Sequence, residues 1–124
     1  MIFVFGSNLA GIHGGGAAKD AVQLHGAING QGWGPQGRSF AIPTKDYRIQ
    51  TLPVREIGYW IDLFIHYAMF HPELEFQVTR IGCGLAGLKD EQVAKFFDVA
   101  PWNCYFDTKW APHFKVNHQY WGTF

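Results

Sequence analysis

Three segments of the 124-residue sequence, two of which contain several glycines, have the composition to surround a phosphorylated ligand. The first segment, residues 6–19, contains consecutive glycines at positions 14–16 directly before an expected helix. Backbone N–H groups of a glycine run attract phosphate, and the partial positive charge of a helix N-terminus adds to that attraction. No Gly-Lys-Ser/Thr closes the segment, so it is not a Walker A loop. It is not a dinucleotide fingerprint either. It predicts a phosphate contact of another kind, with a flexible turn as the alternative.

Another of these segments, residues 81–88, contains Gly82, Gly84 and Gly87. Glycines spaced through a loop that follows a strand let the backbone wrap closely around a ligand. Cys83 lies among them, but no neighbouring His or Asp in the sequence would activate its thiol. A small buried cysteine is therefore the simpler interpretation of that residue.

The remaining segment, residues 42–46, follows a short predicted strand and contains Lys45. A lysine that points into a cleft can act as a nucleophile once its ammonium group has lost a proton. From this segment alone, a solvated surface lysine is the simpler interpretation.

Strands and helices must hold these segments in position. Hydrophobic periodicity predicts where these elements lie, and glycine and proline residues indicate where they end. The expected strands are 2–5, 40–43, 76–81 and 102–106, and the expected helices are 17–25, 53–71 and 90–97. Residues 26–39 are expected to form a loop, and residues 107–124 an irregular aromatic tail. Alternating strands and helices predict a mainly parallel sheet with right-handed crossovers. Ligands bind beyond the carboxyl ends of such strands, so the three segments are expected to share one site.

Composition limits the function classes. The formal net charge is zero, with ten basic and ten acidic side chains, which argues against a dedicated nucleic-acid surface. The length suits one domain, residues 1–124, with a single core. The two cysteines have no metal-binding spacing and predict a reducing setting. The first residues resemble neither a signal peptide nor a membrane span, so we expect a cytoplasmic protein without a membrane partner, in the host cytoplasm if a phage encodes it.

The chain resembles the macrodomain superfamily over about residues 2–107. Two motifs carry this resemblance: Asn8 followed by the glycine run 14–16, and the stretch Ile81–Leu88. The nearest branch is that of the terminal ADP-ribose glycohydrolases and the antitoxin macrodomains that reverse DNA ADP-ribosylation. Those proteins carry a Pro-Thr-Lys-like segment and a Gly-Cys-Gly loop at matching places. The chain is also similar to small macrodomain-like proteins of bacteria and phages. The resemblance implies a compact three-layer α/β/α sandwich with a mostly parallel sheet, here lacking the usual N-terminal strands and followed by the tail 108–124.

The resemblance also implies catalytic roles. It makes Lys45 a candidate nucleophile that attacks C1 of the distal ribose, with Asn8 orienting that ribose. One glycohydrolase subgroup has an aspartate at the position of Ala86, so Asp46 is the candidate that would supply the acid instead. His13 is a candidate acid or base because its unperturbed pKa lies near neutrality, with a solvent-facing loop histidine as the alternative. The implied function is ADP-ribose binding with hydrolysis of an ADP-ribosyl linkage.

A non-catalytic module that senses or sequesters an ADP-ribose-derived or NAD-derived nucleotide is the alternative function. A purely structural subunit would leave the loop glycines unexplained. The adenine-reading aspartate of typical macrodomains has no counterpart here. The segment around Trp33 and the aromatic tail are therefore expected to rebuild the base pocket.

The expected ligand contacts come from the three segments and from the end of the last predicted strand. They are Gly6, Ser7, Asn8, Gly14, Gly15, Gly16, Thr44, Gly82, Cys83, Gly84, Leu85, Ala86, Gly87, Leu88 and Phe106. The expected partner is an ADP-ribose-type nucleotide or an ADP-ribosylated macromolecule. We expect no cofactor and no metal, and a homodimer if the tail exposes its aromatic side chains.

Overall fold

A computed structural model describes all residues from 1 to 124 and contains a six-stranded sheet in the order β2-β3-β1-β4-β5-β6. The strands are β1 Ile2–Asn8, β2 Gly34–Gln36, β3 Ser39–Lys45, β4 Phe76–Val78, β5 Cys104–Asp107 and β6 Gln119–Gly122. The helices are α1 Gly16–Leu24, α2 Val54–Met69 and α3 Asp90–Ala94, with 3-10 helices η1 Lys95–Phe97 and η2 Thr108–His113. All neighbouring strands pair in parallel except β2, which is antiparallel to β3. The predicted α/β fold with a mostly parallel sheet is confirmed.

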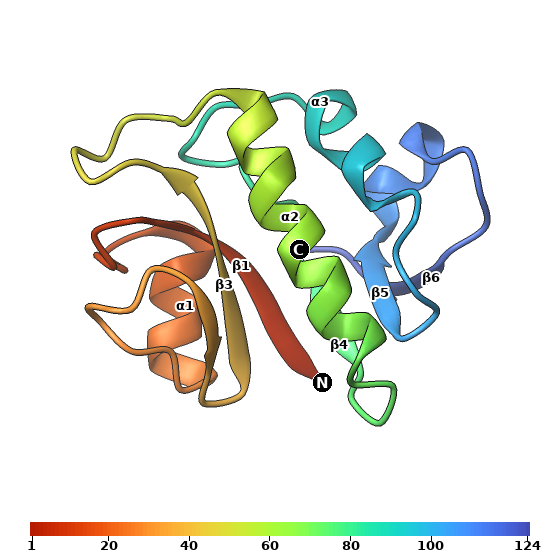
Figure 1. Cartoon of the computed structure of the whole chain (residues 1–124), viewed down its shortest axis with the longest axis horizontal. Coiled ribbons are helices and arrows are strands. Elements are labelled where there is room, and N and C mark those ends of the chain that lie inside the picture. Colours follow the sequence, from red (N-terminus) through yellow and green to blue (C-terminus); the bar gives the residue numbers. More distant parts are fainter.

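Helices pack on both faces of the sheet. Phe3 and Phe5 of β1 face α1, where they form a small core with Ala18 and Ala21. Val4, which alternates with them, points into the larger core on the other face, with α2, α3 and η1. This alternation follows from the period-2 geometry of a strand. Figure 1 shows α2 crossing in front of the sheet, with β1 and β3 beside it.

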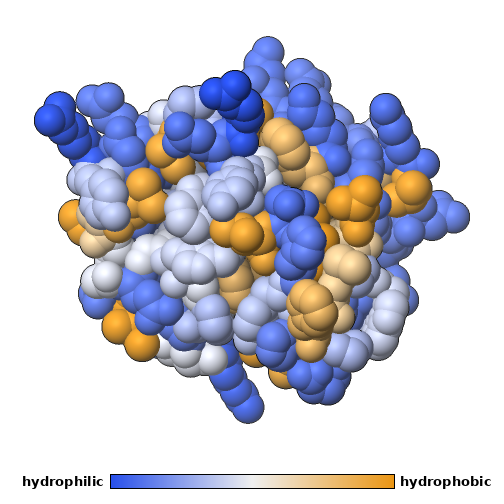
Figure 2. All heavy atoms as spheres, viewed as in Figure 1, coloured by the Kyte–Doolittle hydropathy of each residue, from blue (hydrophilic) through white to orange (hydrophobic).

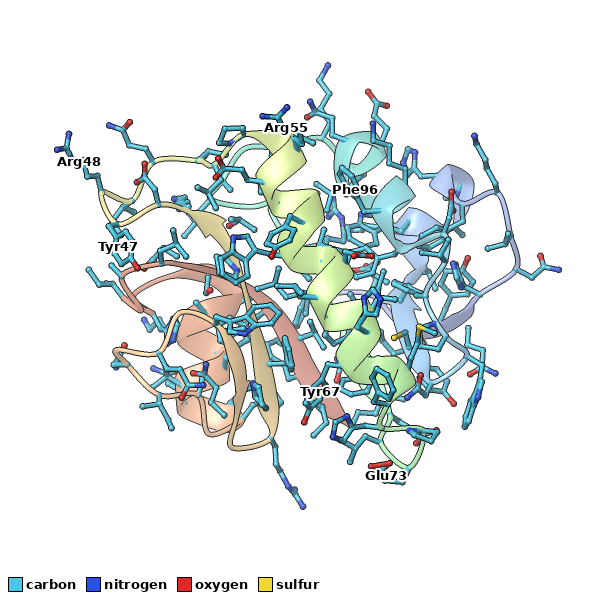
Figure 3. All side chains as sticks on the ribbon, viewed as in Figure 1. Tyr47, Arg48, Arg55, Tyr67, Glu73 and Phe96 are labelled. Carbon is cyan, nitrogen blue, oxygen red and sulfur yellow. The ribbon has the colours of Figure 1, made fainter.

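The larger core depends on close packing around α2. Gly58 of α2 lies against Phe96, and a β-carbon on that glycine would come within 2.4 Å of the Phe96 ring. Figure 3 shows Phe96 beside α2. On the face seen in Figure 2, hydrophobic side chains gather in small groups separated by hydrophilic ones. No helix is both long enough and apolar enough to span a membrane.

The segment 26–39 differs from the predicted loop because it contains β2 and packs tightly on the first glycine segment. A β-carbon on Gly32 would lie 2.2 Å from the carbonyl oxygen of Asn8. Trp33 packs against Phe40 and Trp60, with ring centroids 5.1 and 5.0 Å away. Close backbone approach therefore explains this glycine, and Trp33 belongs to the α2 side of the core and not to a base pocket.

The tail 107–124 was expected to be irregular, but it forms η2 and the parallel edge strand β6. The indole Nε1 of Trp121 donates a hydrogen bond to the carbonyl oxygen of Val78, 2.9 Å away. Trp110 of η2 is fully buried against Phe97 and Phe106. These aromatic anchors add β6 to the sheet beside β5 and explain why the tail is ordered.

Candidate functional site

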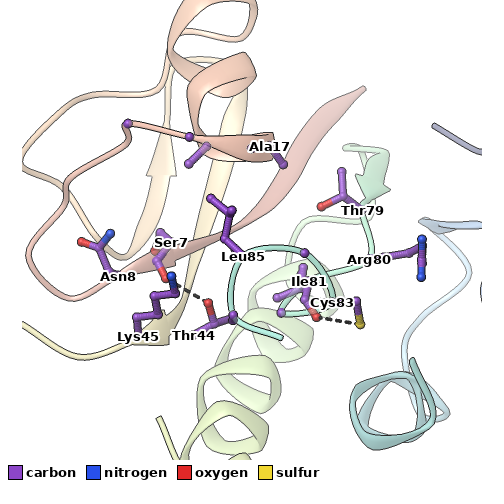
Figure 4. A pocket seen from close by; sticks show the side chains of 18 of the residues that line it. Ser7, Asn8, Ala17, Thr44, Lys45, Thr79, Arg80, Ile81, Cys83 and Leu85 are labelled. Atoms are coloured by element: carbon purple, nitrogen blue, oxygen red, sulfur yellow. Dashed lines mark hydrogen bonds between the residues drawn. The ribbon is translucent and has the colours of Figure 1, made fainter. Parts of the chain in front are cut away.

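A cavity of about 690 Å³ lies where the carboxyl ends of β1, β3, β4 and β5 meet. The two glycine-containing segments and the segment 42–46 all contribute to its wall, as expected from the parallel sheet. In Figure 4, Thr44 and Lys45 lie on one side of the cavity, Arg80 lies on the other, and Leu85 lies between them. The expected contacts that line the cavity are Gly6, Ser7, Asn8, Gly14, Gly15, Gly16, Thr44, Lys45, Gly82, Cys83, Gly84, Leu85 and Ala86.

The glycine run forms the N-terminus of α1. Gly15 is the N-cap residue, and no side chain caps the first turn of the helix. Gly16 has a φ of +58°, a backbone conformation that favours glycine. A β-carbon on Gly14 would meet nothing within 4 Å, so the cavity is open beside this residue. The first N–H groups of α1 are therefore available to an anion in the cavity.

The loop after β4 lies opposite the glycine run. Gly82 has a φ of +78°, and the Leu88 N–H donates to the Gly82 carbonyl oxygen at 2.9 Å, closing a tight turn. Gly84 has open space at its β position, with no atom within 4 Å. Leu85 is 72% exposed, and its Cδ1 lies 3.5 Å from the β-carbon position of Gly16. The two glycine loops thus face each other across the cavity, with Leu85 between them.

Asn8 stabilises the first loop with its side-chain amide. Its Nδ2 donates to the Ile12 carbonyl oxygen at 2.8 Å, and its Oδ1 accepts from the Ile12 N–H at 3.0 Å. Ser7 donates its hydroxyl to the Gly32 carbonyl oxygen, and Thr44 donates its hydroxyl to the Ser7 carbonyl oxygen at 3.1 Å. These three polar side chains line the cavity while they hold its backbone walls in place.

Lys45 ends β3 and lies beside Asn8 on β1. The two residues are register partners, after an irregularity in the pairing between Ser7 and Asn8. The Lys45 carbonyl oxygen accepts from the Leu9 N–H at 2.9 Å, which fixes the backbone at this point. The salt bridges of the chain are His66–Asp62 and Arg80–Asp90, so the Lys45 ammonium has no carboxylate within 4.0 Å. A half-buried cation without an acidic partner therefore lies at the β3 side of the cavity.

Five expected site residues do not line the cavity: His13, Asp46, Gly87, Leu88 and Phe106. Phe106 is fully buried in the core among Phe97, Phe114 and His118, so its expected ligand contact is corrected. Gly87 and Leu88 support the loop turn instead, since their N–H groups donate to Gly84 and Gly82 carbonyl oxygens at 3.0 and 2.9 Å.

His13 and Asp46 have structural partners in place of the expected catalytic positions. His13 is 4% exposed, its Nε2 lies 3.0 Å from the Gln31 carbonyl oxygen, and its ring packs edge-on against Phe5. The Asp46 carboxylate accepts from the N–H groups of Arg48 and Gln50 at 2.8 and 3.0 Å and closes the turn after β3. Tyr47 and Arg48 point outward from this turn (Figure 3). Neither His13 nor Asp46 is placed to exchange a proton inside the cavity.

A charged cluster borders the cavity beside β4. Arg80 donates from Nε and Nη2 to the two oxygens of Asp90 at 2.8 and 2.7 Å, and the Trp110 indole donates to Asp90 at 2.8 Å. The hydrogen bond from Arg80, more than that from Trp110, lowers the pKa of Asp90 to about 2. Burial, followed by the nearby Asp90 carboxylate, raises the pKa of Cys83 to about 12. The Cys83 thiol is thus a poor nucleophile, in line with its interpretation from the sequence.

The sequence did not single out several residues that line the cavity, among them Thr79, Arg80, Asp107 and Phe124. Arg80 lies two residues before the Gly-Cys-Gly stretch, and Asp107 directly follows the last predicted strand. Their positions at strand ends could have identified both as cavity residues. Nothing in the sequence of the tail indicated that Phe124 would reach the cavity. No group of three or more His, Cys, Asp or Glu side chains is arranged to hold a metal ion.

Comparisons with protein-family models, with curated proteins and with solved structures found no match to this chain.

Proposed function

We propose that this chain is a macrodomain-like protein that binds ADP-ribose or a close derivative in the cavity at the carboxyl ends of its strands. The observation that carries the proposal is the convergence of two glycine loops and the unpaired Lys45 on one cavity. A volume of about 690 Å³ suits a ligand of nucleotide size. The uncapped start of α1 provides N–H donors for phosphate, which is the largest charge on such a ligand.

The order of the strands supports an elongated ligand with phosphates at its centre. Lys45 ends β3, the two glycine loops follow the central strands β1 and β4, and Asp107 ends β5. β3 and β5 are separated by three inter-strand spacings, or about 14 Å. The proposed ligand places its diphosphate between the two glycine loops and one sugar beside Lys45.

Hydrolysis of an ADP-ribosyl linkage is a second candidate function, and the position of Lys45 favours it. The deprotonated amine would form a bond to C1 of the distal ribose while the bond from C1 to the leaving group breaks. Water would then cleave the carbon–nitrogen bond, releasing ADP-ribose and restoring the lysine. Two other residues support binding without turnover. The Asp46 carboxylate is engaged in its own turn, and Ala86 in the cavity wall has no acidic group, so neither residue supplies an acid to the cavity.

Titration calorimetry with ADP-ribose, ADP, AMP and ribose 5-phosphate tests the binding proposal. We expect micromolar-scale binding of ADP-ribose and weaker binding of each fragment, because a fragment reaches only part of the cavity. ADP-ribose at a hundred times its dissociation constant should stabilise the fold by about 2.7 kcal/mol. Absence of heat and of thermal stabilisation with all four compounds would reject the proposal.

A further inference from the structure

Ile49 is the only non-glycine residue of the chain with a positive φ, which is +64°. A side chain branched at its β-carbon clashes with the backbone in this conformation. Hydrogen bonds of Asp46 hold the turn around Ile49 in place. The Asp46 N–H donates to the Gln50 carbonyl oxygen at 2.8 Å, and the Asp46 carboxylate accepts from the N–H groups of Arg48 and Gln50. Strain of this kind persists where neighbouring contacts fix it, and it is concentrated beside ligand sites.

The strained turn presents Ile49 to the cavity beside Lys45. Lys45 directly precedes the turn and pairs with Thr51 directly after it, so both ends of the turn lie together where β3 ends. Ile49 lines the cavity and remains 39% exposed. Its apolar side chain is therefore available to a ligand at this end of the cavity.

A second isoleucine reaches the same end of the cavity from the first glycine segment. Ile12 lines the cavity, is 59% exposed, and has both of its backbone polar groups bonded to the Asn8 side chain. Asn8 is in turn the register partner of Lys45. The polar side chains of Asn8 and Asp46 thus each fix a loop that brings an isoleucine to the Lys45 end of the cavity.

The charge of Lys45 and the apolar side chains favour different ligand groups at this end of the cavity. The Lys45 ammonium attracts an anion, but water screens an ion pair at a partly exposed position, so the pair contributes little. Isoleucine side chains donate no hydrogen bonds, so an anionic group beside Ile12 and Ile49 would lose hydration without replacement. An uncharged group loses less hydration and also covers apolar surface. The two isoleucines should therefore outweigh the single cation.

We propose that Ile12 and Ile49 determine specificity at C1 of the distal ribose, where they admit an uncharged substituent and disfavour an anionic one such as phosphate. This inference rests on the proposed function, because that function places the distal ribose beside Lys45. It narrows the ligands of the cavity to ADP-ribosyl compounds that carry a neutral group at C1. It also gives the strained turn a role, since the turn holds Ile49 at the cavity.

The test uses ADP-ribose and two analogues that carry either an isopropyl or a phosphonate group at C1 of the distal ribose. Both groups are tetrahedral and are joined to C1 by a carbon–carbon or carbon–phosphorus bond, so hydrolysis cannot remove them. Calorimetry on the unmodified protein should show at least tenfold tighter binding of the isopropyl analogue than of the phosphonate. Ile49→Asn adds an amide donor for the phosphonate, so this preference should fall to about threefold or less. Ile12→Asn should reduce the preference in the same direction.

Two further variants separate specificity from folding. Asparagine tolerates a positive φ, so Ile49→Asn should melt no lower than the parent protein. Ile49→Val keeps an apolar side chain branched at its β-carbon and should keep the preference for the isopropyl analogue. Ile28→Asn is the matched control, because Ile28 is 52% exposed and does not line the cavity, and it should also keep the full preference.

The possible outcomes distinguish this inference from the proposed function. If ADP-ribose binds but the phosphonate binds as tightly as the isopropyl analogue or more tightly, the specificity assignment is overturned and the proposed function stands. A preference that stays unchanged in both Ile49→Asn and Ile12→Asn would also overturn the assignment. Failure of ADP-ribose and both analogues to bind would reject the proposed function and this inference together.

Discussion

A β-carbon added to Gly15 would lie 3.0 Å from Leu85 Cδ1, so the two glycine loops nearly touch across the cavity. Leu85 is largely exposed and its side chain can rotate away from a new neighbour. Gly15 has an extended backbone, with a φ of −154°, which other residues also adopt. A larger side chain at Gly15 is therefore expected to change the space in the cavity more than it changes the fold.

We predict that Gly15→Val and Gly84→Val both fold and both lose ADP-ribose binding. Gly84 has no atom within 4 Å of its β position, so a valine there would occupy space proposed for the ligand. Thermal unfolding should show stability within about 1 kcal/mol of the parent, whereas calorimetry should show no binding. Normal affinity in both folded variants would mean that these loops are turns and not ligand contacts.

A different glycine should behave in the opposite way. Gly32→Ala places a β-carbon 2.2 Å from the Asn8 carbonyl oxygen, so the backbone must move. We expect a loss of about 1–3 kcal/mol of unfolding free energy, measured by urea denaturation. Gly14→Ala is the matched control, because its new methyl group would meet nothing within 4 Å and should change stability by less than about 0.5 kcal/mol. Similar stabilities for the two variants would contradict this distinction.

The sequence predicted that the candidate segments would meet at one edge of the sheet, because short apolar runs, which form strands, end where the glycine segments begin. Ile2 to Phe5 is apolar, and the strand it begins continues through Asn8, which brings Asn8 to the cavity. The last predicted strand shows how sensitive such reasoning is to register. Adjacent strand residues point to opposite faces, so Phe106 enters the core while its neighbour Asp107 lines the cavity.

Other features depend on tertiary partners that local sequence does not reveal. His13 meets the Gln31 carbonyl oxygen, 18 residues away, and this contact turns a candidate acid into a buried structural residue. The backbone of Gly32 packs so closely against Asn8 that a side chain would not fit. A glycine-rich composition does not reveal this contact, because a flexible loop has the same composition. The strand β6 depends on non-local pairing with β5, and its sequence shows no clean alternation of buried and exposed residues. Long-range contacts of this kind lie beyond what periodicity encodes.

We predict that the two thiols are unreactive in the folded protein at pH 8. Burial raises the pKa of Cys104 to about 12, and burial together with Asp90 raises the pKa of Cys83 to about 12. Thiolate is the reactive form, so both thiols should react slowly with Ellman's reagent until a denaturant is added. Rapid labelling of Cys83 in the native state would contradict this prediction.

The pair formed by Arg80 and Asp90 should make stability depend on pH. The hydrogen bond from Arg80 holds the pKa of Asp90 at about 2, below its usual value of 3.8. A lowered folded-state pKa means that the stabilisation is complete above about pH 4 and is lost as pH falls toward 2. Asp90→Asn should therefore reduce the free energy of unfolding by about 1–3 kcal/mol at pH 7. Urea denaturation should show the difference between parent and variant shrinking below pH 4, whereas a constant difference would exclude this cause.

Lys45 distinguishes the enzyme from the binding module. In an enzyme, Lys45→Ala should abolish release of ADP-ribose from ADP-ribosylated DNA or protein, or phosphate release from ADP-ribose 1″-phosphate. Its affinity for ADP-ribose should stay within a few-fold of the parent, because the diphosphate and the base contact other residues. Borohydride should trap a covalent adduct at Lys45 in the parent and not in the variant. Lys89→Ala is the matched control, because Lys89 is exposed, lies outside the cavity and should leave turnover and trapping unchanged.

The opposite outcome is equally informative for Lys45. If the parent turns over no substrate and Lys45→Ala weakens ADP-ribose binding at least tenfold, the ammonium is an electrostatic contact and the protein is a binding module. Lys45→Arg should then retain most of the affinity, because it keeps the positive charge, whereas in an enzyme it should remain inactive, since a guanidinium stays protonated. Unchanged binding and unchanged turnover in Lys45→Ala would reject both roles. The lysine would then be a bystander in the cavity wall, with ligand binding carried by the glycine loops alone.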